Sequence, residues 1–132
     1  MIFLDCRDKN LSNIHQNHTL PANGWFTNSI TLNGDYFKNQ CDLGNTWYGY
    51  NSGNTVGAIW TTFQGNGTGN LSFGNCYSHG KVKVFLNENS IAEATPSQRK
   101  DISFDYSVGD VLKISEFNTG IWKLYSFSVK CQ

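Results

Sequence analysis

The fold is decided by the stretch Lys81-Val-Lys-Val-Phe-Leu86, which is followed by Asn87-Glu-Asn89 and by the run from Ser90 to Ala94. Apolar and polar residues alternate in the first segment, which places both valines and Leu86 on one face, as in a strand that is buried on one side. Asn is a common turn residue, so the middle segment predicts a reversal of the chain. The stretch therefore predicts an antiparallel hairpin whose second strand is Ser90 to Ala94.

The same alternation recurs along the chain, and no segment shows the apolar period of about 3.6 residues that marks a helix. The segment Gln64 to Thr68 is interpreted as the turn of a hairpin. In the last strand, Tyr125, Phe127 and Val129 are expected to share one face. The other predicted strands are Ser29–Leu32, Trp47–Tyr50, Val56–Phe63, Asn70–Phe73, the alternating run Ile102–Tyr106, Leu112–Ile114 and Ile121–Lys130.

Short strands with turn signals at intervals of about 8 to 12 residues are typical of an all-β domain. We expect an antiparallel β-sandwich of jelly-roll type. It forms a single domain over residues 1–132, with an irregular N-terminal segment at 1–24. A length of 132 residues and a mass of 14.8 kDa suit one domain.

If every predicted turn reverses the chain, the loops fall alternately at two ends of the sandwich. The near end receives the start of Val56–Phe63 and the loops 75–80, 95–100 and 117–120. The far end receives 64–68, 87–89, 107–110 and the C-terminus. Cys76 and Cys131 then lie at opposite ends, too far apart for the Cα separation of at most about 7 Å that a disulfide needs. We therefore predict two disulfides, Cys41–Cys76 and Cys6–Cys131.

The charge balance and the lack of a long apolar run argue against two classes of partner. Ten Lys and Arg offset ten Asp and Glu, so the net charge is zero and the pI is near 6.8. Nucleic-acid affinity depends on an excess of positive charge, and a membrane-spanning helix needs about 20 apolar residues. The sequence has neither feature, so we expect no nucleic-acid partner and no membrane span.

Cysteine usage and glycosylation signals predict a secreted protein. An even number of cysteines in a small chain is typical of disulfides formed in an oxidising compartment. Four Asn-x-Ser/Thr sequons agree, at Asn10, Asn17, Asn66 and Asn70. The start Met1-Ile-Phe-Leu is interpreted as a mature segment with an added Met, so the export signal is expected to lie outside it.

The sequence shows no catalytic constellation, and we expect no enzyme. Its carboxylates are scattered over turns and outward strand positions. His15 and His18 form a His-x-x-His pair without a third ligand nearby. The run Gly65-x-Gly67-x-Gly69 precedes a strand, whereas a dinucleotide-binding loop opens a helix.

The near-end loops gather amides, carboxylates and aromatic rings, which are groups that bind sugars and calcium. Calcium accepts about 6 to 8 oxygen ligands and can bridge sugar hydroxyls. Plainer interpretations remain open: Glu116 as an exposed carboxylate, the asparagines as turn residues, His79 as an exposed loop residue, and Trp47 and Tyr48 as core or interface residues. Trp25, Trp60 and Phe63 are assigned to packing or to a subunit interface. The predicted calcium ligands are Glu116, Asn75, Asn118 and Asp42, and the predicted sugar contacts are Trp47, Tyr48, Tyr77, His79 and Trp122.

Four segments resemble a family of small secreted proteins from corals and sea anemones. They are Val56-Gly-Ala-Ile-Trp-Thr-Thr-Phe-Gln-Gly-Asn-Gly-Thr-Gly-Asn-Leu-Ser-Phe-Gly-Asn-Cys76, Lys81-Val-Lys-Val-Phe-Leu-Asn87, Gly109-Asp-Val-Leu-Lys-Ile-Ser-Glu116 and Trp122-Lys-Leu-Tyr-Ser-Phe-Ser-Val129. A member of this family is a calcium-dependent, galactose-specific sea-anemone lectin. The resemblance implies a β-sandwich, galactose as the ligand, calcium holding its hydroxyls, and a homodimer. It assigns no ligating residue and does not cover the N-terminal half.

The leading hypothesis is a secreted lectin that binds galactose-type terminal sugars through calcium at the near-end loops. A dimer would strengthen binding, because two linked sites raise the apparent affinity. The alternatives are a structural or adhesive matrix protein without a soluble sugar ligand, and a carbohydrate-binding module detached from a glycosidase. Cell agglutination that is abolished by chelator and by galactose would separate the first hypothesis from the others.

Overall fold

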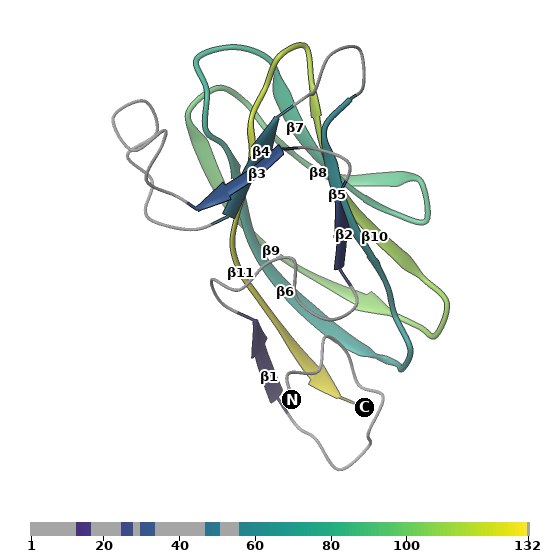
Figure 1. Ribbon diagram of the computed structural model, residues 1–132. Helices are drawn as coiled ribbons and strands as arrows, with labels where there is room; N and C mark the ends of the chain where they lie inside the picture. Colours follow the sequence, from purple (N-terminus) through teal and green to yellow (C-terminus); the bar gives the residue numbers. More distant parts are fainter. Residues whose placement is uncertain (1–12, 17–24, 28–29, 34–46, 51–55, 132) are drawn as a thin grey trace.

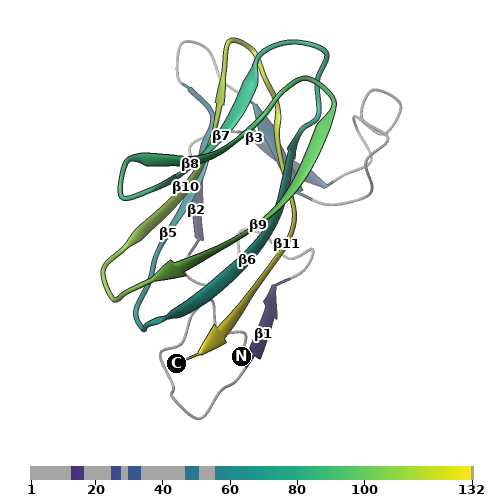
Figure 2. The ribbon, with the colours of Figure 1, turned by 180° about the vertical axis from the view of Figure 1, so that it is seen from behind.

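The computed structural model describes residues 13–16, 25–27, 30–33, 47–50 and 56–131, and the side chains are described from Val56 to Lys130. All regular structure in these residues is β-strand, and every strand pair is antiparallel. The strands form two sheets that face each other (Figures 1 and 2). The predicted antiparallel β-sandwich is confirmed. Within these ranges, no helix is long and apolar enough to cross a membrane.

The strands of the described ranges divide between a six-stranded and a five-stranded sheet. The six-stranded sheet has the order β3 (Ile30–Asn33), β4 (Trp47–Tyr50), β11 (Trp122–Cys131), β6 (Gly67–Asn75) and β9 (Gln98–Tyr106), and β1 (Asn13–Gln16) also pairs with β11. The five-stranded sheet has the order β2 (Trp25–Thr27), β5 (Ala58–Thr62), β10 (Val111–Phe117), β7 (Lys81–Leu86) and β8 (Asn89–Ala94).

The core fills the space between the sheets with alternating residues from each strand. Val82 and Val84 of β7 are fully buried and Leu86 packs against the same cluster, as their alternation predicts. Phe63 stacks on Tyr106 with a centroid separation of 3.7 Å, which joins the two sheets near the far end. The cluster further includes Ile59, Leu71, Phe73, Ala94, Leu112, Ile114, Trp122, Leu124, Phe127 and Val129.

The hairpin that defines the fold is present, but a second predicted hairpin is wrong. Strands β7 and β8 pair across the turn at Asn87–Asn89, with Val82 opposite Ala94. Strands β5 and β6, in contrast, belong to different sheets, so Gln64–Thr68 carries the chain from one sheet to the other. Alternation and turn residues look the same in both cases, because a turn sequence does not specify the partner of the next strand.

The last strand contains a β-bulge that changes which side chains face the core. Trp122 and Leu124 precede the bulge and face the core cluster, as do Phe127 and Val129 after it. The register shifts between Leu124 and Ser126, so Tyr125 leaves the alternation. The prediction that Tyr125 shares a face with Phe127 and Val129 is therefore wrong.

Two short strands lie in the N-terminal part of the described chain. Residues 1–24 are expected to be irregular, but Asn13–Gln16 forms β1 and pairs with β11 from Lys130 to Phe127. Trp25–Thr27 forms β2 at the edge of the five-stranded sheet, where the sequence shows no clear alternation. Both strands are short, and a run of three or four residues shows no readable period.

The loops meet at two ends of the sandwich, and the near end lies at the top of Figure 1. At the near end, Ser97 N donates to Tyr77 O at 3.0 Å and Cys76 N donates to Ile121 O at 2.9 Å. At the far end, Gly109 N donates to Phe63 O at 2.9 Å. These bonds show that the loops expected at each end come together there.

Cys76 and Cys131 lie at opposite ends of the six-stranded sheet. Asn75, which precedes Cys76, is opposite Trp122, whereas Cys131 is opposite Gly67 at the other end of β6. Cys76 is disulfide-bonded, and its partner lies outside the described side chains. The pairs Cys41–Cys76 and Cys6–Cys131 stay a prediction.

Candidate functional site

Asn75 is fully buried at the near end and uses its whole amide to brace two loops. Its Nδ2 donates to the carbonyl oxygens of His79 and Gly80, each at 3.2 Å. Its Oδ1 accepts from the backbone N–H of Tyr77 and Ile121, also at 3.2 Å. An amide has two donors and two acceptor lone pairs, so these four bonds take its full capacity. The prediction of Asn75 as a calcium ligand is corrected: the residue is a structural brace.

Glu116 is also buried and bonded to the backbone, so it is not the exposed carboxylate of the plainer interpretation. Its side chain is 2% exposed, and its Oε1 accepts from Gly57 N at 2.9 Å at the start of β5. Asn118 is exposed in the turn after β10 with φ of 53°, and Asp42 lies outside the described residues. In the described ranges no group of three His, Cys, Asp or Glu could hold a metal ion. The described members of the predicted ligand set therefore do not fit a calcium site.

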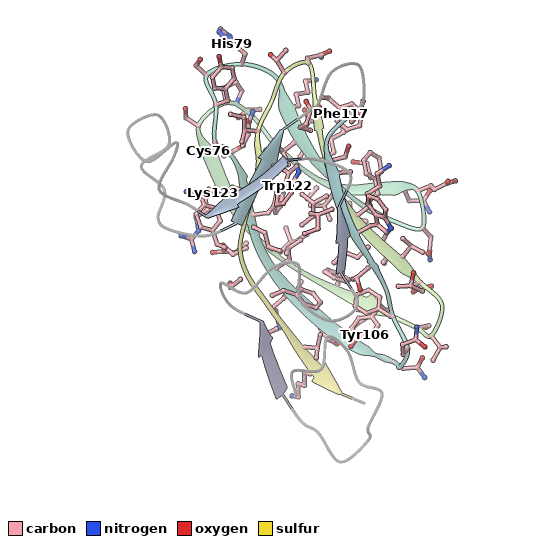
Figure 3. The ribbon with its side chains drawn as sticks, viewed as in Figure 1. Cys76, His79, Tyr106, Phe117, Trp122 and Lys123 are labelled. Carbon is pink, nitrogen blue, oxygen red and sulfur yellow. The ribbon has the colours of Figure 1, made fainter. Side chains whose placement is uncertain are left out.

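Of the predicted sugar contacts, Trp122 is in the core. Its side chain has no exposed surface and lies between the sheets, whereas Lys123 points to the other side (Figure 3). A stacking platform needs an open ring face, so the prediction for Trp122 is wrong. Tyr77 and His79 do lie together at the near end, with ring centroids 5.4 Å apart in an edge contact, and His79 is exposed. Trp47 and Tyr48 belong to β4, and their side chains lie outside the described ones.

A groove of about 710 Å³ lies on the outer face of the five-stranded sheet. Its central row crosses three strands: Lys113 of β10 is opposite Trp60 of β5 on one side and Phe85 of β7 on the other. The two rings are partly exposed, and Lys113 is exposed. Adjacent strands are roughly 4.8 Å apart, so the backbones of Trp60 and Phe85 are separated by about 10 Å.

Phe117 and the β7–β8 turn border the two ends of the groove. The Phe117 ring, labelled in Figure 3, meets Phe85 edge-on at 6.1 Å, and Lys83 Nζ lies 5.3 Å from its centroid. At the other end Asn87 Nδ2 donates to Asp110 Oδ1 at 2.8 Å, which fixes the turn. The lining of β10 runs from Val111 to Phe117, which at about 3.3 Å per residue is roughly 20 Å of strand. The groove is therefore elongated.

The outer face of the six-stranded sheet is different in character. A smaller depression of about 280 Å³ there is lined by small polar and aliphatic residues without an aromatic ring. Its polar groups bond to one another and to neighbours: Ser103 Oγ donates to Asn70 Oδ1, and Arg99 Nε donates to Ser72 Oγ at 3.0 Å. The aromatic groove is thus the stronger candidate for a binding site.

Sequence reasoning missed this groove, although a signal was present. Trp60 is interpreted there as a packing or interface residue, and Phe85 and Phe117 are not singled out. Each of these rings lies at a position of its strand that alternates with the core residues and therefore faces outward. Ile59 and Val84 are fully buried, whereas the adjacent Trp60 and Phe85 are partly exposed. Large aromatic rings on the outward phase of adjacent strands are the pattern that could have revealed the groove.

Neither a protein-family model nor a curated protein matches the sequence. Solved structures do match in three dimensions. The CBM22-1–GH10 modules of Clostridium thermocellum xylanase 10B, complexed with xylohexaose, match with a TM-score of 0.62 and 10% identity over 93% of this chain and 29% of that chain. The catalytic domain of a GH87 α-1,3-glucanase in complex with nigerose matches with a TM-score of 0.54 and 12% identity over 96% of this chain and 29% of that one.

A third match covers nearly the whole of its partner. It is a structure from work on glycan recognition by the Ruminococcus flavefaciens cellulosome, with a TM-score of 0.50 and 12% identity over 92% of this chain and 95% of that chain. The chain spans only 29% of the length of the xylanase and glucanase chains. At these identities the likeness shows a shared β-sandwich fold.

Proposed function

We propose that this chain is a carbohydrate-binding domain whose site is the groove on the outer face of the five-stranded sheet. The observation that supports this most directly is the row of Trp60, Lys113 and Phe85 across three strands. Aromatic faces stack on the C–H surfaces of sugar rings, and nearby polar groups take the hydroxyls. Trp and Phe offer large contact areas with few rotatable bonds, so little conformational entropy is lost on binding.

The structural neighbours support the same class of ligand. The xylanase structure contains xylohexaose, the glucanase structure contains nigerose, and the third is described under glycan recognition. The groove on this chain is elongated along β10, and its rings are two strands apart. We infer that it binds several sugar units of a chain, in contrast to a single terminal sugar held by end loops.

Galactose as the sugar, calcium dependence, a homodimer and secretion enter the proposal from the sequence. Galactose and calcium come from the resemblance, and secretion comes from the cysteines and sequons. The described part of the predicted ligand set does not fit a calcium site. Calcium dependence is therefore tested by running the sugar titration described below with and without a chelator. Binding without turnover is proposed, so the oligosaccharides should be recovered intact.

The experiment is a calorimetric titration of the purified protein with galactotriose, xylohexaose and nigerose. The Trp60→Ala variant should lose at least about tenfold in affinity for the sugar that binds, which corresponds to about 1.4 kcal/mol. The Val108→Ala variant is the matched control, because Val108 is 62% exposed in the far-end turn outside the groove lining. Equal binding by both variants, or no binding of any sugar by the unmodified protein, would overturn the proposal.

A further inference from the structure

We propose that the groove selects glycans that bear anionic substituents, carboxylate or sulfate, through Lys113 and Lys83; this inference rests on the proposed function. Lys113 stands at the centre of the groove, and Lys83 is its diagonal neighbour on β7, because Lys113 is opposite Phe85 and Ser115 is opposite Lys83. Both side chains belong to the outward phase of their strands.

The lysines of this face differ in their partners. Lys81 forms an ion pair with Glu93, with Nζ 3.4 Å from Oε1. Glu93 is opposite Lys83 in the register, but its carboxylate pairs with Lys81. Among the described residues, neither Lys83 nor Lys113 forms a salt bridge. Two ammonium groups are thus available in and beside the groove.

The charges around the groove are unevenly distributed. Lys81, Lys83 and Lys113 contribute three positive charges, and Glu88, Glu93 and Asp110 contribute three negative ones, so the net charge is zero. Glu88 lies in the turn that borders the far end of the groove, whereas Lys113 lies between the aromatic rings. The central part of the groove is therefore its most positive part.

Desolvation makes the central lysine selective. Trp60 and Phe85 flank Lys113 on β10, so a sugar chain in the groove that contacts both rings also covers Lys113. A neutral sugar removes water from the ammonium group and returns only weak hydrogen bonds, which is unfavourable. A carboxylate or sulfate forms a charge-assisted hydrogen bond with the ammonium group and offsets that loss.

Single-stranded nucleic acid also combines negative charge with stacking faces. Its affinity depends on many phosphate contacts, and two lysines cannot supply them in a chain with zero net charge. In addition, Lys83 Nζ lies 5.3 Å from the centroid of the Phe117 ring at one end of the groove. The two lysines therefore do not form a continuous row of positive charge that could follow a phosphate backbone. The observations therefore favour an acidic glycan.

The test compares three probes that share one sugar configuration: galactotriose, trigalacturonic acid and a sulfated galactotriose. At low salt, at least one acidic probe should bind about tenfold tighter than galactotriose. The preference should shrink near 1 M salt, where the Debye length is about 3 Å. Lys113→Gln should lower the ratio of acidic to neutral affinity about tenfold, with a smaller reduction for Lys83→Gln. The carboxylate and sulfate arms identify which anion is preferred.

Lys130→Gln is the matched control, because Lys130 is an exposed lysine on β11 of the other sheet. If galactotriose binds as tightly as both acidic probes, or if Lys113→Gln keeps the acidic preference, this inference is wrong and the proposed function stands. If no sugar binds the unmodified protein, the proposed function fails with it. Binding of an oligothymidine as tight as that of the acidic sugars would also overturn the selectivity for glycans.

Discussion

At the residue scale, Asn75 shows how one side chain can support a whole end of the sandwich. Its amide holds the loop after β6 and the start of β11 through four hydrogen bonds. A turn-forming asparagine and a metal-ligating asparagine look identical in the sequence, and only these contacts separate them.

We expect Asn75→Ala to lower the free energy of unfolding by about 2 to 4 kcal/mol, because buried backbone groups lose their partners. Urea unfolding measures this change. Asn70→Ala is the control and should lower stability by less than about 1 kcal/mol, since Asn70 is exposed on β6 and loses only the bond that Ser103 donates to it. An Asn75→Ala variant that keeps its stability but loses calcium-dependent binding would contradict the bracing role.

Tyr125 is the second residue whose surroundings give a measurable effect. Burial raises its pKa, and the guanidinium of Arg99, 4.1 Å from the ring, opposes the rise in part. Its buried hydroxyl has no hydrogen-bond partner in the described structure. The folded state therefore keeps the phenol protonated at a pH where the unfolded chain, with a pKa near 10, has begun to ionise.

The sign of the pH effect follows from proton binding. Above about pH 10 the folded chain holds more protons at Tyr125 than the unfolded chain, so stability is full below that pH and falls as pH rises. Tyr125→Phe should remove this part of the alkaline loss and raise stability at neutral pH by about 1 kcal/mol, because no unpaired hydroxyl is buried. Urea unfolding at neutral pH and near pH 10.5, with Tyr77→Phe as the control, measures both effects. A destabilised Tyr125→Phe variant would show that the hydroxyl is bonded.

At the scale of elements, the turns after β6 and β10 pack directly on each other. A Cβ at Gly80 would lie 2.4 Å from Gly120 N and from Phe117 O, and Gly80 has φ of +74°. Gly109, in the far-end turn, has φ of +89°, but a Cβ there would meet nothing within 4 Å. Comparing Gly80 with Gly109 therefore separates two contributions to stability: the left-handed backbone, which both share, and the close backbone contact, which only Gly80 has.

We expect Gly80→Ala to destabilise the protein by more than about 3 kcal/mol and Gly109→Ala by about 1 kcal/mol. The difference comes from the backbone clash at the near end, since both positions share a left-handed conformation. Thermal unfolding of the two variants measures it. Equal losses would mean that the two near-end turns do not need to touch.

Strand positions could be predicted from the sequence, whereas strand partners could not. The alternation in Lys81–Leu86 gives the strand and its buried face, and Val82 and Val84 are fully buried as expected. The same rule fails at Tyr125, where a bulge changes the phase, and at Gln64–Thr68, where the chain changes sheets. Bulges and crossings depend on contacts between distant segments, which local periodicity does not contain.

At the scale of the whole molecule, the candidate site lies on a sheet face rather than on the end loops. The near-end residues Asn75 and Glu116 bond to the backbone, and Trp122 is buried, so sequence reasoning located the loops but not their role. The groove residues Trp60, Lys113 and Phe85 come from three strands that are distant in the sequence. Their row exists only through strand register, so it could not be read from any single segment.

Several Asn and Gly residues of the described turns have a structural role. The chain has 13 glycines among its 132 residues, and the described turns use them where the backbone is left-handed or crowded. Asn66, Asn75 and Asn87 place their side chains on turn backbone groups or neighbouring loop residues. These described residues therefore support the loops, and the aromatic residues on one sheet face remain as the feature that points to a ligand.

The most direct test of the proposed binding face is a two-dimensional amide NMR titration with the oligosaccharide that binds best. We expect shift changes at Trp60, Lys113, Phe85 and their neighbours on β5, β10 and β7, with the signals of 75–80 and 118–120 largely unchanged. Changes confined to those near-end loops, or spread over the outer face of the six-stranded sheet, would contradict the assignment of the groove.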